Sequence, residues 1–421
     1  MAEANPDPST PTGTEERRPV ILQVLPALVT GGVERGTVDV ARAIVEAGGQ
    51  ALVASSGGPM VRELDRIGAT HIQLPLDSKN PVTIRRNVGR LVKLIEDYGV
   101  NLVHARSRAP AWSAWWATRR TGTPFVTTYH GAYNEGGWGL KRRYNSVMVK
   151  GDRVIAVSNF IARHIEERHG VDPERVRVIH RGVDLTRFHP AHVSPERAIQ
   201  LATRWRLPDG YPVIMLPGRL TRWKGQTVLI DALARLGRTD LRCLLVGSDQ
   251  GRTAYTDELK AQIKRLNLGE VVHIVGECND MPAAYMLTDV VVSASIEPEA
   301  FGRVVVEGQA MGRPVLATNL GGAAETVQPG RTGFLVPPND PAALAAGLEH
   351  ILAMTPEERQ SLADDSIAAA ETLFSNRAMC DKTLDVYAEL LTPAAAPSPD
   401  EAPAGDDPAD GHPHLSTDGA T

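Results

Sequence analysis

Residues 19–56 read PVILQVLPALVTGGVERGTVDVARAIVEAGGQALVASS, and this stretch decides the fold class. Residues 19–25 are apolar and partly β-branched without a polar alternation, which is typical of a strand buried on both faces. A loop ending in Gly31-Gly32 follows, then a helical stretch over 33–47, a second glycine pair and another apolar strand. A strand, a glycine loop, a helix and a strand in this order predict the opening of a doubly wound α/β fold.

The same rhythm continues along the chain and is interrupted once. Strand and helix patterns alternate up to residue 179, the stretch 183–208 is polar without a strand pattern, and a second series starts at residue 212. We therefore expect two Rossmann-like doubly wound domains that face a central cleft, with a last helix crossing back to the first domain. The expected divisions are a disordered tail (1–18), a first domain (19–195), a second domain (196–375), the crossing helix (376–391) and a disordered acidic Pro/Ala-rich tail (392–421).

The composition indicates a globular protein of a reducing compartment. The chain has 421 residues, 42% of them hydrophobic and 23% charged, which is ordinary for soluble domains. Its three cysteines are far apart and in no metal-ligand spacing, so a disulfide framework is not expected. No apolar run approaches the length of about 18 residues that a membrane-spanning helix needs, and the first residues lack the apolar core of a secretory signal. These features predict a cytoplasmic protein.

The net charge of −5 is divided unevenly along the chain. Residues 19–195 contain 24 Lys and Arg against 15 Asp and Glu, a net charge of +9, and the rest of the chain is acidic. A basic half indicates an anionic partner such as a membrane surface or a phosphorylated acceptor, although a solvated Arg-rich surface is the alternative. Two basic clusters are candidates for contact with the inner face of the membrane. The first contains Arg85, Arg86, Arg90 and Lys93 beside the apolar Val88, Leu91, Val92 and Ile95. The second contains Lys141, Arg142 and Arg143 near Trp138.

Two carboxylates stand out in the second series. Glu299 and Glu307 are separated by seven residues, and the apolar residues 289–293 before them read as a buried strand. Gly302 opens a helical stretch, so Glu299 lies in the loop after a strand and Glu307 about one turn into the next helix. Ligands bind at such loops in open parallel sheets, and helix N-termini attract phosphate. A surface carboxylate plus a carboxylate on a helix face is the alternative interpretation.

Two cations precede this carboxylate pair by about 80 residues. Gly218 ends the first strand of the second series, and Arg219 and Lys224 follow it. Arg presents a fork of donors to phosphate oxygens and Lys a point charge, so both could neutralise a diphosphate leaving group. An ordinary basic loop is the alternative. As a loop cation, Lys224 is expected to be removable without harm to the fold.

Together, these motifs resemble those of retaining glycosyltransferases with the GT-B fold, family 4 in particular. The match consists of the Glu-x7-Glu segment from Glu299 to Glu307 and the Gly-Arg…Lys-Gly segment around Arg219 and Lys224. The resemblance implies that Glu299 and the amides near Phe301 and Gly302 position the donor sugar. It also implies that Glu307 binds the ribose of the nucleotide, and that Arg219 and Lys224 clamp the pyrophosphate.

The resemblance extends with less specificity into the first domain. His130 follows a predicted strand, and the resemblance implies that it supports the charge developing at the reaction centre. Gly31 and Gly32 resemble the family's Gly-Gly loop, where the backbone approaches the donor. Residues 181–184 match a recurrent Asn-Gly-Val-Asp segment except that Arg181 replaces the Asn, so no site is drawn from it. No Asp-x-Asp occurs, so no metal site is expected.

The expected function is transfer of a sugar from an NDP-sugar, the donor substrate, to a sugar or lipid-linked acceptor. Cell-envelope glycan, lipopolysaccharide or glycolipid synthesis would use such a reaction. The first domain would bind the acceptor and the second the nucleotide sugar; neither a further cofactor nor nucleic acid is expected. An NDP-sugar 2-epimerase of the same fold and a non-catalytic nucleotide-sugar binding protein are the alternatives.

Overall fold

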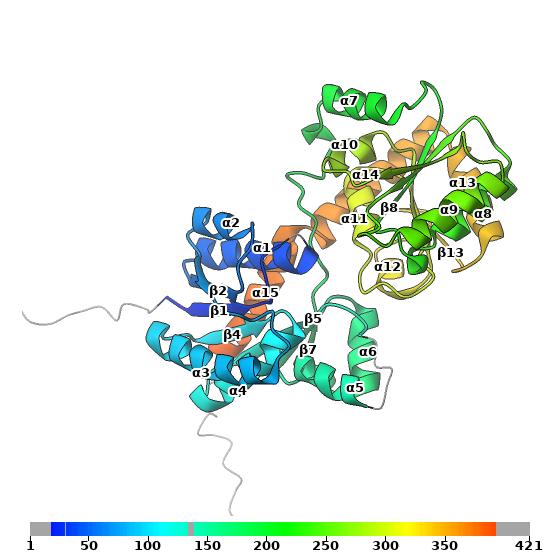
Figure 1. The fold of residues 1–421 in the computed structure, drawn as a ribbon. Coiled ribbons are helices and arrows are strands. Elements are labelled where there is room, and N and C mark those ends of the chain that lie inside the picture. Colours follow the sequence, from blue (N-terminus) through cyan, green and yellow to red (C-terminus); the bar gives the residue numbers. More distant parts are fainter. Residues whose placement is uncertain (1–17, 30, 134–138, 393–421) are drawn as a thin grey trace, which may run out of the picture. The chain divides into compact units, whose positions relative to one another are not determined.

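The structure is a computed structural model that describes residues 18–29, 31–133 and 139–392. Within these ranges the chain forms a seven-stranded and a six-stranded sheet, and every strand pair is parallel (Figure 1). The first sheet contains, in spatial order, β3 (Thr70–Gln73), β2 (Gln50–Ser55), β1 (Val20–Val24), β4 (Leu102–Ala105), β5 (Phe125–Tyr129), β6 (Arg153–Ala156) and β7 (Val176–Val178). The second contains β10 (Val272–Gly276), β9 (Arg242–Val246), β8 (Val213–Pro217), β11 (Val290–Ser293), β12 (Val315–Thr318) and β13 (Phe334–Val336).

Each sheet is wound in two directions from its middle. In the first sheet the chain runs outward from β1 to β3, then returns to β4 and continues outward to β7. In the second it runs from β8 to β10 and then from β11 to β13. The neighbouring pairs β1–β4 and β8–β11 are therefore the points where the strand order reverses. Such a reversal separates the two connecting loops and opens a crevice for a ligand at the carboxyl ends of the strands.

The strands are apolar at successive positions because both faces of each sheet are covered. All five residues of β1 are buried, and successive residues enter different cores. Leu22 and Val24 belong to one apolar cluster of the first domain, and Ile21 and the following Leu25 belong to the other. Because side chains alternate between the two faces of a strand, a strand covered on both sides needs apolar residues at every position. This explains why the strand pattern lacks a polar alternation.

The helices cover the faces of these sheets. Those between the strands of the first sheet are α1 (Gly32–Glu46), α2 (Val61–Arg66), α3 (Pro81–Tyr98), α4 (Arg108–Thr121), α5 (Leu140–Asn145) and α6 (Asn159–His169). Those that follow are α7 (Pro195–Trp205), α8 (Gln226–Leu236), α9 (Thr253–Arg265), α10 (Met281–Met286), α11 (Arg303–Ala310), α12 (Gly321–Glu325), α13 (Pro341–Leu352), α14 (Pro356–Leu373) and α15 (Asn376–Leu391). The expected α/β class with two doubly wound sheets is confirmed.

Three helical segments differ from the sequence interpretation. Helix α7 lies in the polar stretch 183–208 that separates the two strand–helix series, and Leu201 is the residue that it buries. Around the basic cluster of Lys141, Arg142 and Arg143, the sequence pattern predicts one helix over 138–149. The structure has α5 followed by a 3-10 turn over Ser146–Val149, and residue 138 lies outside the described residues. The short helix α12 carries two glycines and three small or acidic residues, which gave no helical pattern.

The apolar face of α3 belongs to the core and not to a membrane. Val88, Leu91 and Ile95 are 0–5% exposed and lie in an apolar cluster of the first domain. The neighbouring cations Arg85 and Arg86 are exposed to solvent. This selects the alternative in which the cations of α3 are solvated and its apolar stripe packs on the domain.

The last helix crosses back to the first sheet, as expected. In Figure 1 the orange α15 lies beside α1 and β4, and its Cys380, Val386 and Tyr387 are buried in the same apolar cluster as Ile21. The Tyr387 hydroxyl is 2.6 Å from Nδ1 of the buried His104. The polar end of the tyrosine is therefore paired where burial would otherwise leave it without a hydrogen bond.

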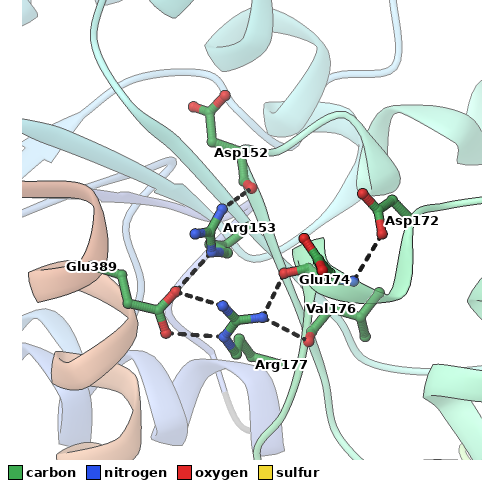
Figure 2. Close-up of polar contacts among 7 residues, drawn as sticks. All are labelled: Asp152, Arg153, Asp172, Glu174, Val176, Arg177 and Glu389. Atoms are coloured by element: carbon green, nitrogen blue, oxygen red, sulfur yellow. Dashed lines mark hydrogen bonds and ion pairs between the residues drawn. The ribbon is translucent and has the colours of Figure 1, made fainter. Parts of the chain in front are cut away.

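A carboxylate clamp joins α15 to the edge of the first sheet (Figure 2). Glu389 accepts hydrogen bonds from Arg153 Nε on β6 at 2.7 Å and from Arg177 on β7 at 2.9 and 2.8 Å. Arg177 thus uses two parallel N–H groups, the geometry that makes Arg–carboxylate pairs strong and directional. The hydrogen bond from Arg177 is the main reason why the pKa of Glu389 lies below its ordinary value.

We predict that Glu389→Gln lowers the free energy of unfolding by about 1 kcal/mol near neutral pH, because the clamp is partly exposed to water. A carboxylate with a lowered pKa stabilises the fold above its unfolded-state pKa, and this contribution disappears as the pH falls through the folded-state value. Wild type and variant should therefore converge in stability as the pH falls below the ordinary glutamate pKa of about 4.3. Urea unfolding between pH 3 and 8 measures this. The control is Glu349→Gln, which replaces an exposed carboxylate of α13 that forms no ion pair with any described residue, and it should change nothing. A difference in unfolding free energy between wild type and Glu389→Gln that stays constant down to pH 3 would contradict the clamp.

Candidate active site

The candidate site of the second domain lies at the carboxyl ends of β8 and β11, the two strands at the reversal point. The loop after β8 carries Arg219 and Lys224, and the loop after β11 carries Glu299. Because β8 and β11 are adjacent and parallel, their two loops emerge at the same sheet edge. Residues about 75 positions apart in the sequence are thereby brought into contact.

Lys224 and Glu299 form an ion pair that is almost withdrawn from water. Lys224 Nζ is 2.7 Å from Glu299 Oε1, and the two side chains are 11% and 10% exposed. Ser295 donates to the same oxygen, whereas Glu299 Oε2 has no hydrogen-bond partner within the described part of the chain. Lys224 is therefore not the exposed loop cation expected from the sequence, because the loops fold over it. Glu299 keeps one oxygen available for a ligand hydroxyl.

Trp223 is close to both candidate cations. Lys224 Nζ is 4.6 Å from the centroid of the indole ring, and the guanidinium carbon of Arg219 is 5.9 Å from it. An aromatic face attracts both cations, so the ring reduces the repulsion that two like charges at one site would otherwise feel. Trp223 was not named as a site residue; its place between Arg219 and Lys224 in the sequence was the available signal.

Glu307 occupies a separate buried position on α11. It is 7% exposed, accepts a hydrogen bond from Tyr285 at 2.9 Å on Oε2, and accepts one from Arg303 at 2.8 Å on Oε1. Burial and the neighbouring Glu307 raise the pKa of Tyr285 well above its ordinary value, so the hydroxyl remains a donor. Each carboxylate oxygen can accept a second hydrogen bond. Tyr285 lies 22 residues before Glu307, and no sequence motif links them.

The turn before α11 depends on the backbone of Gly302. This residue has φ of +84°, and a Cβ placed on it would lie 2.5 Å from Cβ of Ala323. The Phe301 side chain is 3% exposed and packs against Phe374, so only its backbone is available to a ligand. The N–H groups in the first turn of a helix lack intrahelical acceptors and favour anions. The turn thus presents such donors beside Glu299.

The first domain assembles its own polar group at the carboxyl edge of its sheet. Gly31 precedes α1 and Gly32 begins it, His130 follows β5, and Arg181 follows β7. Arg181 donates to Nδ1 of His130 at 3.1 Å and to the carbonyl oxygen of Gly32. A Cβ on Gly32 would lie 2.9 Å from a guanidinium nitrogen of Arg181, so a side chain there would displace this contact. Arg181 was the departure from the family pattern from which no site was drawn.

His130 is neutral and offers a single unpaired nitrogen. Burial, together with the charges of Arg181 and Arg106, holds the pKa of His130 well below its ordinary value. Its Nε2 is buried and has no partner within the described residues. Because buried polar atoms are normally paired, an unpaired one at a sheet edge indicates a place for a ligand group or an ordered water.

The described residues contain no group of three or more His, Cys, Asp or Glu side chains that could bind a metal ion. Among the same residues, no helix is both long and apolar enough to cross a bilayer.

Two doubly wound domains with these sites define a glycosyltransferase of GT-B architecture, and comparison with known proteins agrees. Residues 30–187 match the family described as "Glycosyltransferase Family 4", and residues 200–367 match "Glycosyl transferases group 1". The chain belongs to the glycosyltransferase family that these two descriptions name.

Three similar proteins illustrate the relationship. The crystal structure of a glycosyltransferase from Rickettsia africae is 41% identical, with a TM-score of 0.83 over 90% of this chain and 100% of that one. The structure of Anabaena HepE in complex with UDP-glucose is 25% identical, with a TM-score of 0.75 over 88% of this chain and 99% of that one. D-inositol 3-phosphate glycosyltransferase of Streptomyces bingchenggensis is 32% identical over 57% of this chain. That match spans 53% of the Streptomyces protein's length.

We predict that Lys224→Met reduces turnover and stability together. Removing one partner of a buried ion pair leaves an uncompensated charge, so the free energy of unfolding should fall by about 3 kcal/mol. Removing a charge that stabilises a departing diphosphate should cost on the order of 100-fold in kcat. Urea unfolding and initial rates at saturating donor measure the two effects.

The double variant Lys224→Met/Glu299→Gln separates these effects, since it removes both charges. It should recover most of the stability and remain inactive. A single variant as stable as wild type would contradict the buried pair, and unchanged kcat would remove Lys224 from the mechanism.

Proposed function

We propose that the protein is a metal-independent retaining glycosyltransferase that moves a sugar from an NDP-sugar to an acceptor. The observation that carries this proposal is the buried Lys224–Glu299 pair at the β8–β11 reversal point, with Arg219 beside it. A cation and a carboxylate with a free oxygen suit a ligand that has a diphosphate on one side and a polyhydroxylated ring on the other.

Each group has a distinct role in this proposal. Arg219, Lys224 and the first turn of α11 receive the diphosphate and stabilise its negative charge as the glycosidic bond breaks. Glu299 Oε2 accepts a hydrogen bond from a sugar hydroxyl, and Glu307, oriented by Tyr285, accepts from the ribose. His130 approaches from the first domain with its free Nε2 and supports the reaction centre. Retention is proposed to follow from attack on the same face of the sugar.

The domain roles follow the same division. The first domain (19–195) would bind the acceptor, and the second domain (196–375) would bind the nucleotide sugar. Helix α15 returns to the first domain. The basic first domain and the inositol phosphate in the names of the relatives support an acceptor that carries a phosphate. Lipid-linked intermediates of cell-envelope glycans, lipopolysaccharide or glycolipids belong to this class.

The proposal predicts slow release of NDP from the matching NDP-sugar, with and without EDTA, because fixed protein charges would neutralise the diphosphate. A screen of NDP-sugars by thermal shift selects the donor, since a bound ligand raises apparent stability. Product analysis by chromatography then measures turnover. Loss of activity in EDTA with recovery in magnesium or manganese would overturn metal independence. Isomerised NDP-sugar would indicate an epimerase, and binding without any product would indicate a binding protein.

Attachment to the inner face of an anionic membrane is a further part of the proposal. Five cations surround one broad cavity of about 1090 Å³ beside Trp115 and Trp116. They are Arg119, Arg142, Arg143, Lys150 and Arg175. None of the five forms an ion pair with a carboxylate in the described ranges, in contrast to Arg153 and Arg177 nearby. Unpaired cations beside tryptophan support contact with acidic lipid headgroups, each cation contributing about 1 kcal/mol.

We predict that the protein co-sediments with anionic vesicles at low salt and does not with neutral vesicles. Replacing Lys141, Arg142 and Arg143 with Ser should weaken this binding and leave NDP-sugar affinity unchanged. The matched control replaces Arg85, Arg86 and Arg90 of α3 with Ser, which removes the same charge from a helix whose apolar face is in the core. Equal losses in both triple variants would mean a general charge effect, and no sedimentation of wild type would favour a soluble acceptor.

A further inference from the structure

One guanidinium joins three separate loops of the first domain. Arg181 lies beyond β7, yet its side chain reaches His130 beyond β5 and Gly32 beyond β1. The strands β1, β5 and β7 are not neighbours in the sheet, so the side chain crosses the carboxyl ends of the strands between them. No ion pair joins Arg181 to a carboxylate among the residues that the structure describes, so its partners are neutral acceptors.

This contact decides which nitrogen of His130 carries the proton. A guanidinium has only donors, so Nδ1 of His130 must accept. A neutral imidazole that accepts at Nδ1 carries its proton on Nε2. An imidazolium would place an N–H group against the guanidinium, which two like charges also disfavour. Nε2 is the buried atom without a partner, so what it presents is an N–H donor.

The other charged and titratable groups near His130 act in the same direction. Arg106 is buried behind it, and its positive charge also disfavours a protonated His130. His104 is fully buried, bonds Tyr387 and Thr128 through its two nitrogens, and has a pKa well below its ordinary value, mainly because of burial. His104 therefore supplies no proton to His130. Arg181 remains protonated at neutral pH, although burial lowers its pKa to about 9.

We propose that Arg181 is a positioning residue that fixes His130 as a neutral Nε2–H donor, directed at an oxygen of the bound sugar or acceptor. This rests on the proposed function. In this form His130 does not act as a general base through Nε2. The bond from Arg181 to the Gly32 carbonyl holds the glycine loop in the same arrangement, so one side chain sets both features. The replacement of Asn by Arg at this position is thus part of the site.

The first test reads the tautomer directly and needs no enzymatic activity. In protein labelled with 15N-histidine, with the His130 signals assigned by loss in His130→Gln, Nδ1 should be unprotonated and Nε2 protonated from pH 6 to 8. Arg181→Met removes the donor at similar length; His130 should then show mixed tautomers and titrate at a higher pH than in wild type, although burial and Arg106 still hold its pKa below the ordinary value. A wild-type imidazolium at pH 7, a proton on Nδ1, or identical spectra in Arg181→Met would overturn the proposal.

The second test is kinetic. Arg181→Met should lower kcat on the order of 10-fold or more with little change in the KM for donor, and should add an acid limb to the pH profile at a higher pH than any such limb of wild type. The limb has this sign because loss of the neighbouring cation raises the pKa of His130, which then becomes charged as the pH falls. Arg181→Lys, which keeps a donor, should restore part of kcat. Arg187→Met removes an exposed cation from the same loop and should leave kcat unchanged.

A double-mutant cycle shows whether Arg181 acts through His130. In a His130→Ala background, Arg181→Met should have no further effect on kcat. A full additional loss would mean that Arg181 acts on the ligand or the fold, and would overturn the positioning role. If wild type transfers no sugar to any acceptor, the proposed function fails, whereas the tautomer measurement still decides the role of Arg181.

Discussion

Backbone crowding at the carboxyl edge of the second sheet is the constraint on which the site around Lys224 and Glu299 depends. A Cβ on Gly225 would lie 1.8 Å from the carbonyl oxygen of Ala294, and one on Gly321 would lie 2.6 Å from that of Glu299. Both glycines have positive φ values, which L side chains rarely adopt. The loops after β8, β11 and β12 can therefore stack directly on one another. That close approach brings Lys224 within hydrogen-bonding distance of Glu299 and excludes water from the pair.

The two domains treat buried charge differently. In the second domain two buried carboxylates are compensated: Glu299 pairs with Lys224, and Glu307 receives donors from Tyr285 and Arg303. Desolvation makes such pairs costly to break, so they also hold the loops in place before any ligand binds. In the first domain the hydrogen-bond partners of the Arg181 guanidinium within the described residues are neutral acceptors. The two carboxylates of the second domain are thus matched by donors from the protein, whereas the positive charge of Arg181 has no carboxylate ion pair among the described residues.

The same winding serves two chemical purposes. Both sheets reverse their strand order in the middle, and both place glycine loops at the reversal. In the second domain the loops deliver charged side chains, and in the first a glycine at the start of α1 leaves room for Arg181. The fold alone does not distinguish these outcomes, since it supplies only a sheet edge and helix ends. The residues on the loops decide what is bound there.

Local sequence determined the elements and the contiguous motifs, and tertiary structure decided the contacts between distant residues. The residue patterns of buried strands and of helices recur over a few positions, so these elements could be predicted from the sequence. The placement of Glu299 on a loop and of Glu307 on the following helix could be predicted for the same reason. The burial of Lys224 and its bond to Glu299 could not, since 75 residues separate them. The same holds for Tyr285 with Glu307 and for Arg181 with His130. Such pairs are selected by the distances between loops in the folded sheet, and no local preference encodes them.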